Sequence, residues 1–282
     1  MKHQIGIMQG RLTQPKGRGI QFFPFENWEN EFYAAKKLGL DEIEFIFDYD
    51  RYKENPLWTE EGIKRIQEVK ESTGIKINAI CFDYFMRRPF FKEEPGLYES
   101  VKEENTIIIH KILSAMKQLG ISLLEVPLVD NSSLKNPLEK NAFREWLSGI
   151  VESSDESIRF GLETDLNPQD FVEYLRAFDN IRIGANYDSG NSSGIGYDLY
   201  EEVTSLKDYI FNIHIKDRVY QGKTVQLGTG SADFERLFEG LSQIGYQHNF
   251  ILQAARGEEG EEEKNISNQM KFVKEYIEKY HI

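Results

Sequence analysis

Cysteine, histidine and positive charge are all scarce in this sequence of 282 residues. Its one cysteine, Cys81, excludes an intrachain disulfide framework and is typical of a reducing compartment, so we expect a cytoplasmic protein. The formal net charge of −13 opposes binding to nucleic acid, which normally meets a basic face. No apolar run is long enough to span a bilayer, and the N-terminus lacks the apolar core of a signal peptide. We therefore expect neither a nucleic-acid nor a membrane partner.

The chain instead contains a strict alternation of short apolar runs and longer segments of helical period. Expected strands cover residues 4–8, 42–47, 76–82, 122–127, 158–163, 181–187, 210–215 and 250–254. Expected helices cover residues 29–38, 59–72, 96–119, 137–152, a short stretch from 168, 199–206, 232–244 and 262–280. Strands rich in Ile, Leu, Val and Phe on both faces favour a parallel sheet covered by helices. Eight such units predict an α/β protein with one (β/α)8 TIM barrel over residues 1–282. An open doubly wound sheet is disfavoured because GIMQGR lacks the G-x-G-x-x-G spacing.

Polar side chains stand where several expected strands end. The stretch NIHIKDR, residues 212–218, carries His214 at the end of an apolar run, and three other runs end at Glu163, Asp188 and Gln253. A strand histidine is also commonly a hydrogen-bonded core residue. Because all strands of a barrel end at one rim, however, we expect these four side chains to converge. Two carboxylates, an imidazole and an amide oxygen then predict a divalent-metal site.

Other polar residues follow the same strand ends, where Asp and Asn also commonly cap turns. They are Gln9, Arg11, Glu44, Asp48, Asp83, Glu125, Asp130, Asp165, Asn191, Lys216, Asp217, Arg218 and Arg256.

Six segments carry a resemblance to a known family. They are GIMQGRL near the start, LETD at 162–165, NYDSGN at 186–191, HIKDR at 214–218, LGTGSADF at 227–234 and FILQ at 250–253. Over the whole chain and in this order, they resemble the sugar phosphate isomerase/epimerase branch of the xylose isomerase-like barrel superfamily. That superfamily contains aldose–ketose isomerases, 3-epimerases, dehydratases of cyclic polyols and apurinic endonucleases, so the resemblance implies the fold more narrowly than the reaction.

The resemblance implies one divalent ion, Mn²⁺, Mg²⁺ or Co²⁺ with Zn²⁺ as a further candidate, held by Glu163, Asp188, His214 and Gln253. Many relatives have glutamate in the last position and use it, with the glutamate of the fifth strand, as the two bases of an epimerase. Gln253 can coordinate a hard cation but cannot accept a proton at neutral pH. Asp83 is a second departure, since many relatives have histidine there. The second acid or base would then be Glu44, Asp83 or Lys216.

The function implied is metal-dependent isomerisation or epimerisation of a small sugar or sugar phosphate. Glu163 would remove the α-proton to give a metal-stabilised enediolate, and Lys216 would protonate or polarise a sugar oxygen unless it pairs with Asp217. The GTGS turn at 228–231 is a candidate phosphate site, with charge from Arg11 and Arg256. The side chains expected to bind substrate are Gln9, Arg11, Glu44, Asp83, Asn191, Arg218 and Arg256.

Two alternatives remain open: a metal-dependent keto-polyol dehydratase and a non-catalytic sugar-binding barrel. An endonuclease is disfavoured, because that branch relies on several zinc ions and many histidines, whereas this chain has five histidines and a charge that repels DNA. Since relatives often assemble, a homodimer or homotetramer is expected.

Overall fold

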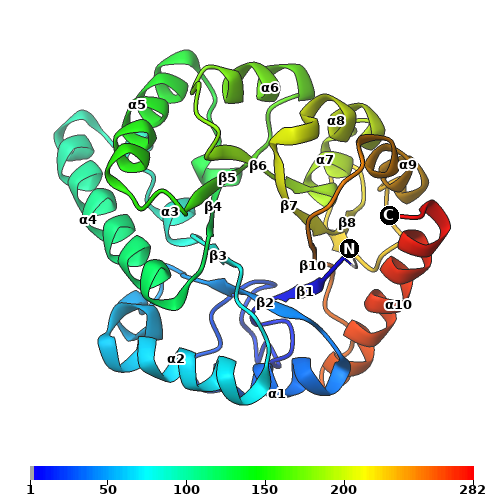
Figure 1. The fold of residues 1–282 in the computed structure, drawn as a ribbon. Helices are drawn as coiled ribbons and strands as arrows, with labels where there is room; N and C mark the ends of the chain where they lie inside the picture. The colour runs from blue at the N-terminus through cyan, green and yellow to red at the C-terminus, as the bar shows by residue number, and fades with distance from the viewer. Residues whose placement is uncertain (1–2) are drawn as a thin grey trace.

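The computed structural model describes residues 3–282, which form a closed barrel of parallel strands inside a ring of helices (Figure 1). The order of strands around the barrel is β1-β10-β7-β6-β5-β4-β3-β2. Their bounds are β1 Ile5–Met8, β2 Glu42–Ile46, β3 Ala79–Cys81, β4 Leu123–Leu128, β5 Arg159–Thr164, β6 Ile183–Asp188, β7 Ile210–Ile215 and β10 Phe250–Leu252. All eight overlap the expected strands, and the predicted (β/α)8 barrel is confirmed.

In residues 3–282, α-helices connect the strands, most of them on the outside of the barrel. They are α1 Trp28–Leu38, α2 Glu60–Thr73, α3 Tyr84–Arg87, α4 Pro95–Leu119, α5 Pro137–Ser153, α6 Pro168–Arg176, α7 Ser189–Ile195, α8 Leu199–Leu206, α9 Phe234–Ile244 and α10 Glu262–Tyr280. Short 3-10 helices cover Tyr52–Glu54, Pro56–Trp58, Phe90–Lys92, Asp130–Ser132 and Lys207–Tyr209. Their ends follow local signals: the Thr59 hydroxyl accepts from the Gly62 N–H at the start of α2, and Gly74, at φ +76°, ends that helix.

Four elements of the rim were not expected from the sequence. Helix α3 follows β3, helix α7 begins directly after β6, and β8 (Asp217–Arg218) pairs antiparallel with β9 (Thr224–Val225) after β7. The sequence of α7, SGNSSGI, has no apolar period, so its pattern predicts a loop. The helix forms because the Asp188 side chain accepts from the N–H groups of Gly190 and Asn191 at its first turn. These elements lie at the end of the barrel where the polar residues gather.

The barrel interior is unusually polar. The main apolar core lies between strands and helices, whereas Met8, Ile46, Cys81 and Ile251 form a separate small cluster. Hydrogen bonds link buried Glu44, Asn186, Asn212 and His214, which come from β2, β6 and β7. Buried polar groups are retained where they are mutually satisfied or have a chemical role. Among residues 3–282, no helix combines the length and apolar character needed to cross a membrane.

Candidate active site

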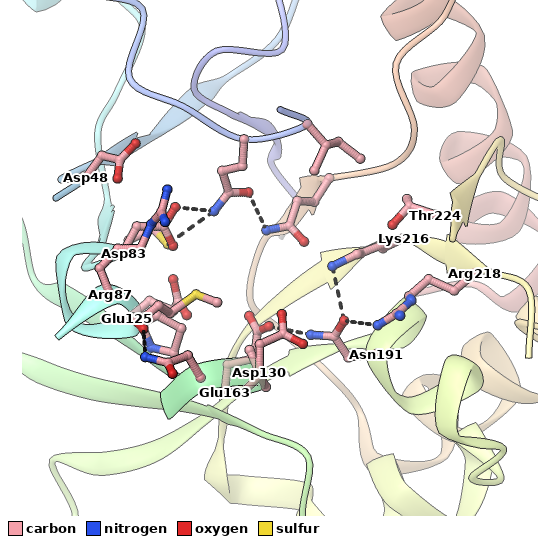
Figure 2. A pocket seen from close by; sticks show the side chains of 18 of the residues that line it. Asp48, Asp83, Arg87, Glu125, Asp130, Glu163, Asn191, Lys216, Arg218 and Thr224 are labelled. Atoms are coloured by element: carbon pink, nitrogen blue, oxygen red, sulfur yellow. Dashed lines mark hydrogen bonds between the residues drawn. The ribbon is translucent and has the colours of Figure 1, made fainter. Parts of the chain in front are cut away.

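A pocket of about 450 Å³ opens at the C-terminal ends of the strands, within the size range of small-molecule sites. Figure 2 shows Asp48, Asp83 and Arg87 on one side of it and Lys216, Arg218 and Thr224 on the other. Its polar lining consists of Gln21, Asp48, Asp83, Arg87, Glu125, Asp130, Asn131, Glu163, Asn191, Lys216, Arg218, Lys223, Thr224 and Gln253.

The predicted site residues divide into three groups. Asp188 and His214 are buried and bond to lining residues. Gln9 lies away from the lining, where its Oε1 accepts from the backbone N–H of Ile46. Arg11, Glu44 and Arg256 are also absent from the lining, although they were expected to bind substrate. The predicted residues that do line the pocket are Asp83, Glu163, Asn191, Lys216, Arg218 and Gln253.

His214 is fully buried between two carboxylates. Its Nδ1 is 3.2 Å from Glu163 Oε2 and its Nε2 is 2.8 Å from Glu44 Oε1. Burial by itself lowers the pKa of His214, but the charges of Glu44 and Glu163 outweigh it, so the pKa stands well above its ordinary value. Asn212 donates to the second Glu44 oxygen at 2.7 Å. Glu44 therefore holds the imidazole from within the barrel, as outer carboxylates do for metal-ligating histidines, instead of contacting the pocket.

Glu163 is fixed by two amides. Asn186 donates to Oε2 at 3.0 Å, and Asn191, in the first turn of α7, donates to Oε1 at 2.5 Å. The side chain stays 8 % exposed and forms part of the pocket lining. A carboxylate with this orientation can receive a proton from a molecule in the pocket or bind a cation there.

Glu125, on β4, is the unsatisfied carboxylate of the site. It is fully buried, and within residues 3–282 no N–H or O–H group reaches either of its oxygens, while the nearby Cys81 thiol is a weak donor. Burial raises the pKa of Glu125 well above its ordinary value, the charge of Glu163 raises it further, and the Cys81 thiol lowers it slightly. One ligating atom each from Glu125, Glu163 and His214 lie within 4.8 Å of one another. We call these three residues the Glu125–Glu163–His214 cluster.

Gln253 adds a further oxygen to the pocket lining. Its Oε1 is buried and has no donor within the described chain. Acceptor oxygens that lack donors, together with an imidazole, are the donor set that a hard divalent cation takes. The residues present therefore fit the predicted ion. Glu125 was noted in the sequence only as a strand-end residue, and its partnership with Glu163 and His214 was missed.

Asp188 and Lys216 form an ion pair at the rim, with Lys216 Nζ 3.0 Å from Asp188 Oδ2. The other oxygen, Asp188 Oδ1, accepts from the N–H groups of Gly190 and Asn191, both at 2.8 Å. Lys216 also donates to Asn191 Oδ1 at 3.1 Å, and Figure 2 shows Asn191 between Lys216 and Glu163. The partner of Lys216 is thus Asp188, and the alternative pairing with Asp217 is wrong. Both Asp188 oxygens already have hydrogen-bond partners, and its role as a cation ligand stays a prediction.

Three of the four N–H groups of the GTGS turn, those of Thr229, Gly230 and Ser231, are occupied in hydrogen bonds within the protein. Those of Gly230 and Ala232 donate to the Asp217 carboxylate at 2.9 and 3.0 Å, and those of Thr229 and Ser231 donate to backbone carbonyls. These bonds occupy the donors that an anion would need. The structure therefore does not support the expectation that this turn binds phosphate.

Arg11 and Arg256 brace the loop between β1 and α1. Arg256 donates to the carbonyls of Gly10 and Ile20 at 2.8 and 3.0 Å. Arg11 donates to the same Ile20 carbonyl and, at 3.4 Å, to the backbone carbonyl of Gln253. Guanidinium groups committed to backbone carbonyls and lying off the pocket lining are not positioned for a phosphate, contrary to the expectation from sequence.

Gln21, in the same loop, is a lining residue that the sequence analysis missed. Its Nε2 donates to Asp83 Oδ2 at 2.6 Å, and its Oε1 accepts from Gln253 Nε2 at 3.1 Å. No pattern marks a glutamine in an irregular loop. By contrast, Asn186 and Asn212 stand two residues before Asp188 and His214, and the period of two along a strand could have placed them on the inward face.

Comparison with known proteins identifies the family of this fold. The family model described as "Xylose isomerase-like TIM barrel" matches residues 32–276. L-ribulose-5-phosphate 3-epimerase UlaE of Escherichia coli O1:K1 / APEC is 24% identical over 239 residues, covering 81% of this chain and 82% of that protein. The protein of the same name from Salmonella heidelberg (strain SL476) is 25% identical over 240 residues, with the same coverage.

Solved structures with low sequence identity share the fold. An L-ribulose 3-epimerase superposes with a TM-score of 0.74 at 15% identity, covering 99% of this chain and 96% of that one. The apo form of the 3-keto-D-glucoside 4-epimerase YcjR from E. coli superposes with a TM-score of 0.72 at 18% identity, covering 96% and 100%.

Proposed function

This chain belongs to the xylose isomerase-like TIM barrel family, and we propose that it is a divalent-metal-dependent sugar epimerase acting on a ketose at the carbon next to its carbonyl. The proposal is supported by relatives over most of the chain that are L-ribulose-5-phosphate 3-epimerases. The main structural support for this proposal is the Glu125–Glu163–His214 cluster, because two of its members, Glu125 and Glu163, line the pocket.

The chain's own side chains provide the means to hold the ion. Glu125, Glu163, His214 and the amide oxygen of Gln253 would hold it, and Glu44 would orient His214 through Nε2. When bound, a divalent cation makes the proton between a carbonyl and a hydroxyl more acidic and stabilises the negative charge that follows its removal. Mn²⁺ is the ion we propose, because oxygen ligands with one imidazole suit it.

Two residues would move the protons. Glu163 takes the proton from the carbon, since its carboxylate lines the pocket and is fixed by two amides. Lys216 returns a proton, since its ammonium lines the same pocket and two of its three N–H groups are held, by Asp188 and Asn191. Glu44, off the pocket lining, is the weakest of the earlier candidates for this second role. Asp83 is tied to Gln21.

A phosphorylated ketose suits one wall of the pocket. Lys216, Arg218 and Lys223 line this wall. Lys216 and Arg218 also donate to Asn191, whereas Lys223 does not share this partner. Cationic side chains at a pocket rim favour a phosphate over a neutral hydroxymethyl group. The proposed substrate class is therefore a pentulose 5-phosphate, to be compared with the corresponding free pentulose.

Proton transfer is tested by incubating Mn²⁺-loaded protein with L-ribulose 5-phosphate in D₂O and following carbon 3 by NMR and mass spectrometry. With Glu163 removing a proton and Lys216 delivering a deuteron, the inverted product carries one deuterium from the first turnover. A product lighter by one water molecule supports the keto-polyol dehydratase. Absence of deuterium exchange with phosphorylated and free pentuloses, despite measurable binding, supports the non-catalytic barrel and contradicts the proposal.

The assembly and cellular location stay predictions. A homodimer or homotetramer is checked by sedimentation equilibrium, and a cytoplasmic location is checked by cell fractionation.

A further inference from the structure

Gln21 links two parts of the pocket that are far apart in sequence. It lies between β1 and α1, whereas its partners Asp83 and Gln253 follow β3 and β10. Its amide nitrogen donates to Asp83 Oδ2 at 2.6 Å, and its amide oxygen accepts from Gln253 Nε2 at 3.1 Å. In Figure 2, Asp83 lies on the side of the pocket opposite Lys216 and Arg218.

The direction of this chain of hydrogen bonds is fixed from one end. An ionised carboxylate can only accept, whereas an amide donates from its nitrogen and accepts at its oxygen. Asp83 therefore requires the nitrogen of Gln21, which turns the Gln21 oxygen toward Gln253. Gln253 must then turn its own nitrogen toward Gln21, and its oxygen is left buried without a donor from the described residues.

The backbone beside Gln21 is held in place as well. The carbonyl of Ile20 accepts from both Arg11 and Arg256, the latter at 3.0 Å. Arg11 also bonds to the backbone carbonyl of Gln253 at 3.4 Å. Two guanidinium groups thus fix the residue before Gln21, and one of them ties that position to the end of β10.

We propose that Gln21 is a positioning residue that directs the amide oxygen of Gln253 toward the Glu125–Glu163–His214 cluster and so completes the cation site. The inference rests on the proposed function and deepens it. It also explains why Asp83 and Gln253 occur together. A glutamate at position 253 would set a carboxylate oxygen against the Gln21 oxygen, and Gln21 cannot turn over without facing its oxygen to Asp83.

The test measures the dissociation constant for Mn²⁺ alone, by electron paramagnetic resonance of free Mn²⁺, on the metal-free full chain. Gln21→Met weakens Mn²⁺ binding by about 10-fold or more, the usual effect of losing a residue that orients a ligand. In a Gln253→Glu background the same change has no such effect, because either oxygen of a carboxylate can face the ion. Gln14→Met is the matched control, since Gln14 is exposed in the same loop, and it leaves the affinity unchanged.

Two results would overturn the inference: an unchanged affinity in Gln21→Met, or an equal loss in both backgrounds, which is what a loop-packing role gives. Failure of the wild-type chain to bind Mn²⁺ would contradict the proposed function as well, so the two failures are distinguishable. If Gln21→Met does not fold, Asp83→Asn replaces it, because an asparagine at that position can also donate and so lets the chain of amides reverse. Asp83→Asn must then weaken binding more than Asp48→Asn, which removes a charge from the same pocket, and an equal loss refutes the inference.

Discussion

Replacing Glu163 by glutamine removes the proposed base with little change in side-chain size. Two amide nitrogens donate to the carboxylate in the structure, those of Asn186 and Asn191, and His214 Nδ1 lies 3.2 Å from it. A glutamine places its own NH₂ group against at least one of them. The substitution therefore has a structural cost and a chemical cost, which can be measured separately.

The two costs differ in size. A buried donor left without an acceptor costs about 1–3 kcal/mol, so we expect the free energy of unfolding of Glu163→Gln to fall by about that amount. Loss of a general base slows proton transfer by about 10²–10⁴-fold. At about 1.4 kcal/mol per factor of ten, this is about 3–5 kcal/mol of activation free energy. The rate of exchange should therefore fall by more than the stability loss explains.

The assay is deuterium incorporation at carbon 3 of L-ribulose 5-phosphate at saturating Mn²⁺, with urea unfolding measured in parallel. Glu125→Gln is the matched control, because it also removes a buried carboxylate of the cluster but breaks no hydrogen bond among the described residues. It should weaken Mn²⁺ binding without lowering the stability of the metal-free protein, and it should retain exchange once saturated with Mn²⁺. Exchange by folded Glu163→Gln within about threefold of wild type, well short of the loss expected for a missing base, would refute Glu163 as the base.

Three further predictions concern other residues of the barrel and its pocket. Glu44→Gln leaves either His214 or Asn212 facing an NH₂ group, so the dissociation constant for Mn²⁺ should rise by about 10–100-fold, and an unchanged constant in calorimetry would contradict the orienting role of Glu44. Lys216→Met should lower kcat by about 10²-fold or more for phosphorylated and free pentulose alike, because it removes the proposed proton donor. Lys223→Gln should instead lower kcat/KM for the phosphorylated sugar alone. The reverse pattern in steady-state kinetics would contradict the roles proposed for the two lysines. Glu42, at the start of β2, has its pKa raised by burial from 4.5 to about 7, which at about 1.4 kcal/mol per pH unit is about 3 kcal/mol. Because the pKa of Glu42 is higher in the folded state, this contribution to the free energy of unfolding is lost as the pH rises from about 4.5 to about 7. Glu42→Gln should therefore lose less stability than wild type over this pH range in urea unfolding. Equal pH profiles for the two proteins would contradict the prediction.

The barrel could be predicted because its signals are local. Apolar runs of strand length alternate with helical periods, and residues such as Thr59 and Gly74 mark where α2 begins and ends. Since parallel strands of a barrel end at one rim, the sequence also predicted that Glu163 and His214 come together, which the structure confirms at 3.2 Å. Helix α7 was missed because its stability depends on the Asp188 cap and on packing, not on an apolar period.

The depth of a side chain within the barrel could not be predicted. Glu44 and Glu125 both lie within strands, β2 and β4, but the structure puts Glu44 against the Nε2 side of His214, while Glu125 lines the pocket. Such differences depend on the stagger between strands, which no single run of residues contains. The hydrogen bonds of Arg11 and Gln21 could not be predicted from the sequence either. Their partners include residues far along the chain and backbone carbonyls, which have no sequence signature.

The central claim is that the pocket holds a divalent cation between Glu163 and His214. Crystals grown with Mn²⁺ and measured near the manganese absorption edge test it most directly. An anomalous difference peak within about 2.5 Å of both a Glu163 oxygen and His214 Nδ1, with an oxygen of Glu125 or Gln253 completing the shell, is the predicted result. A fully soaked crystal without a peak in contact with these two side chains, or with the ion bound only elsewhere, would contradict the account.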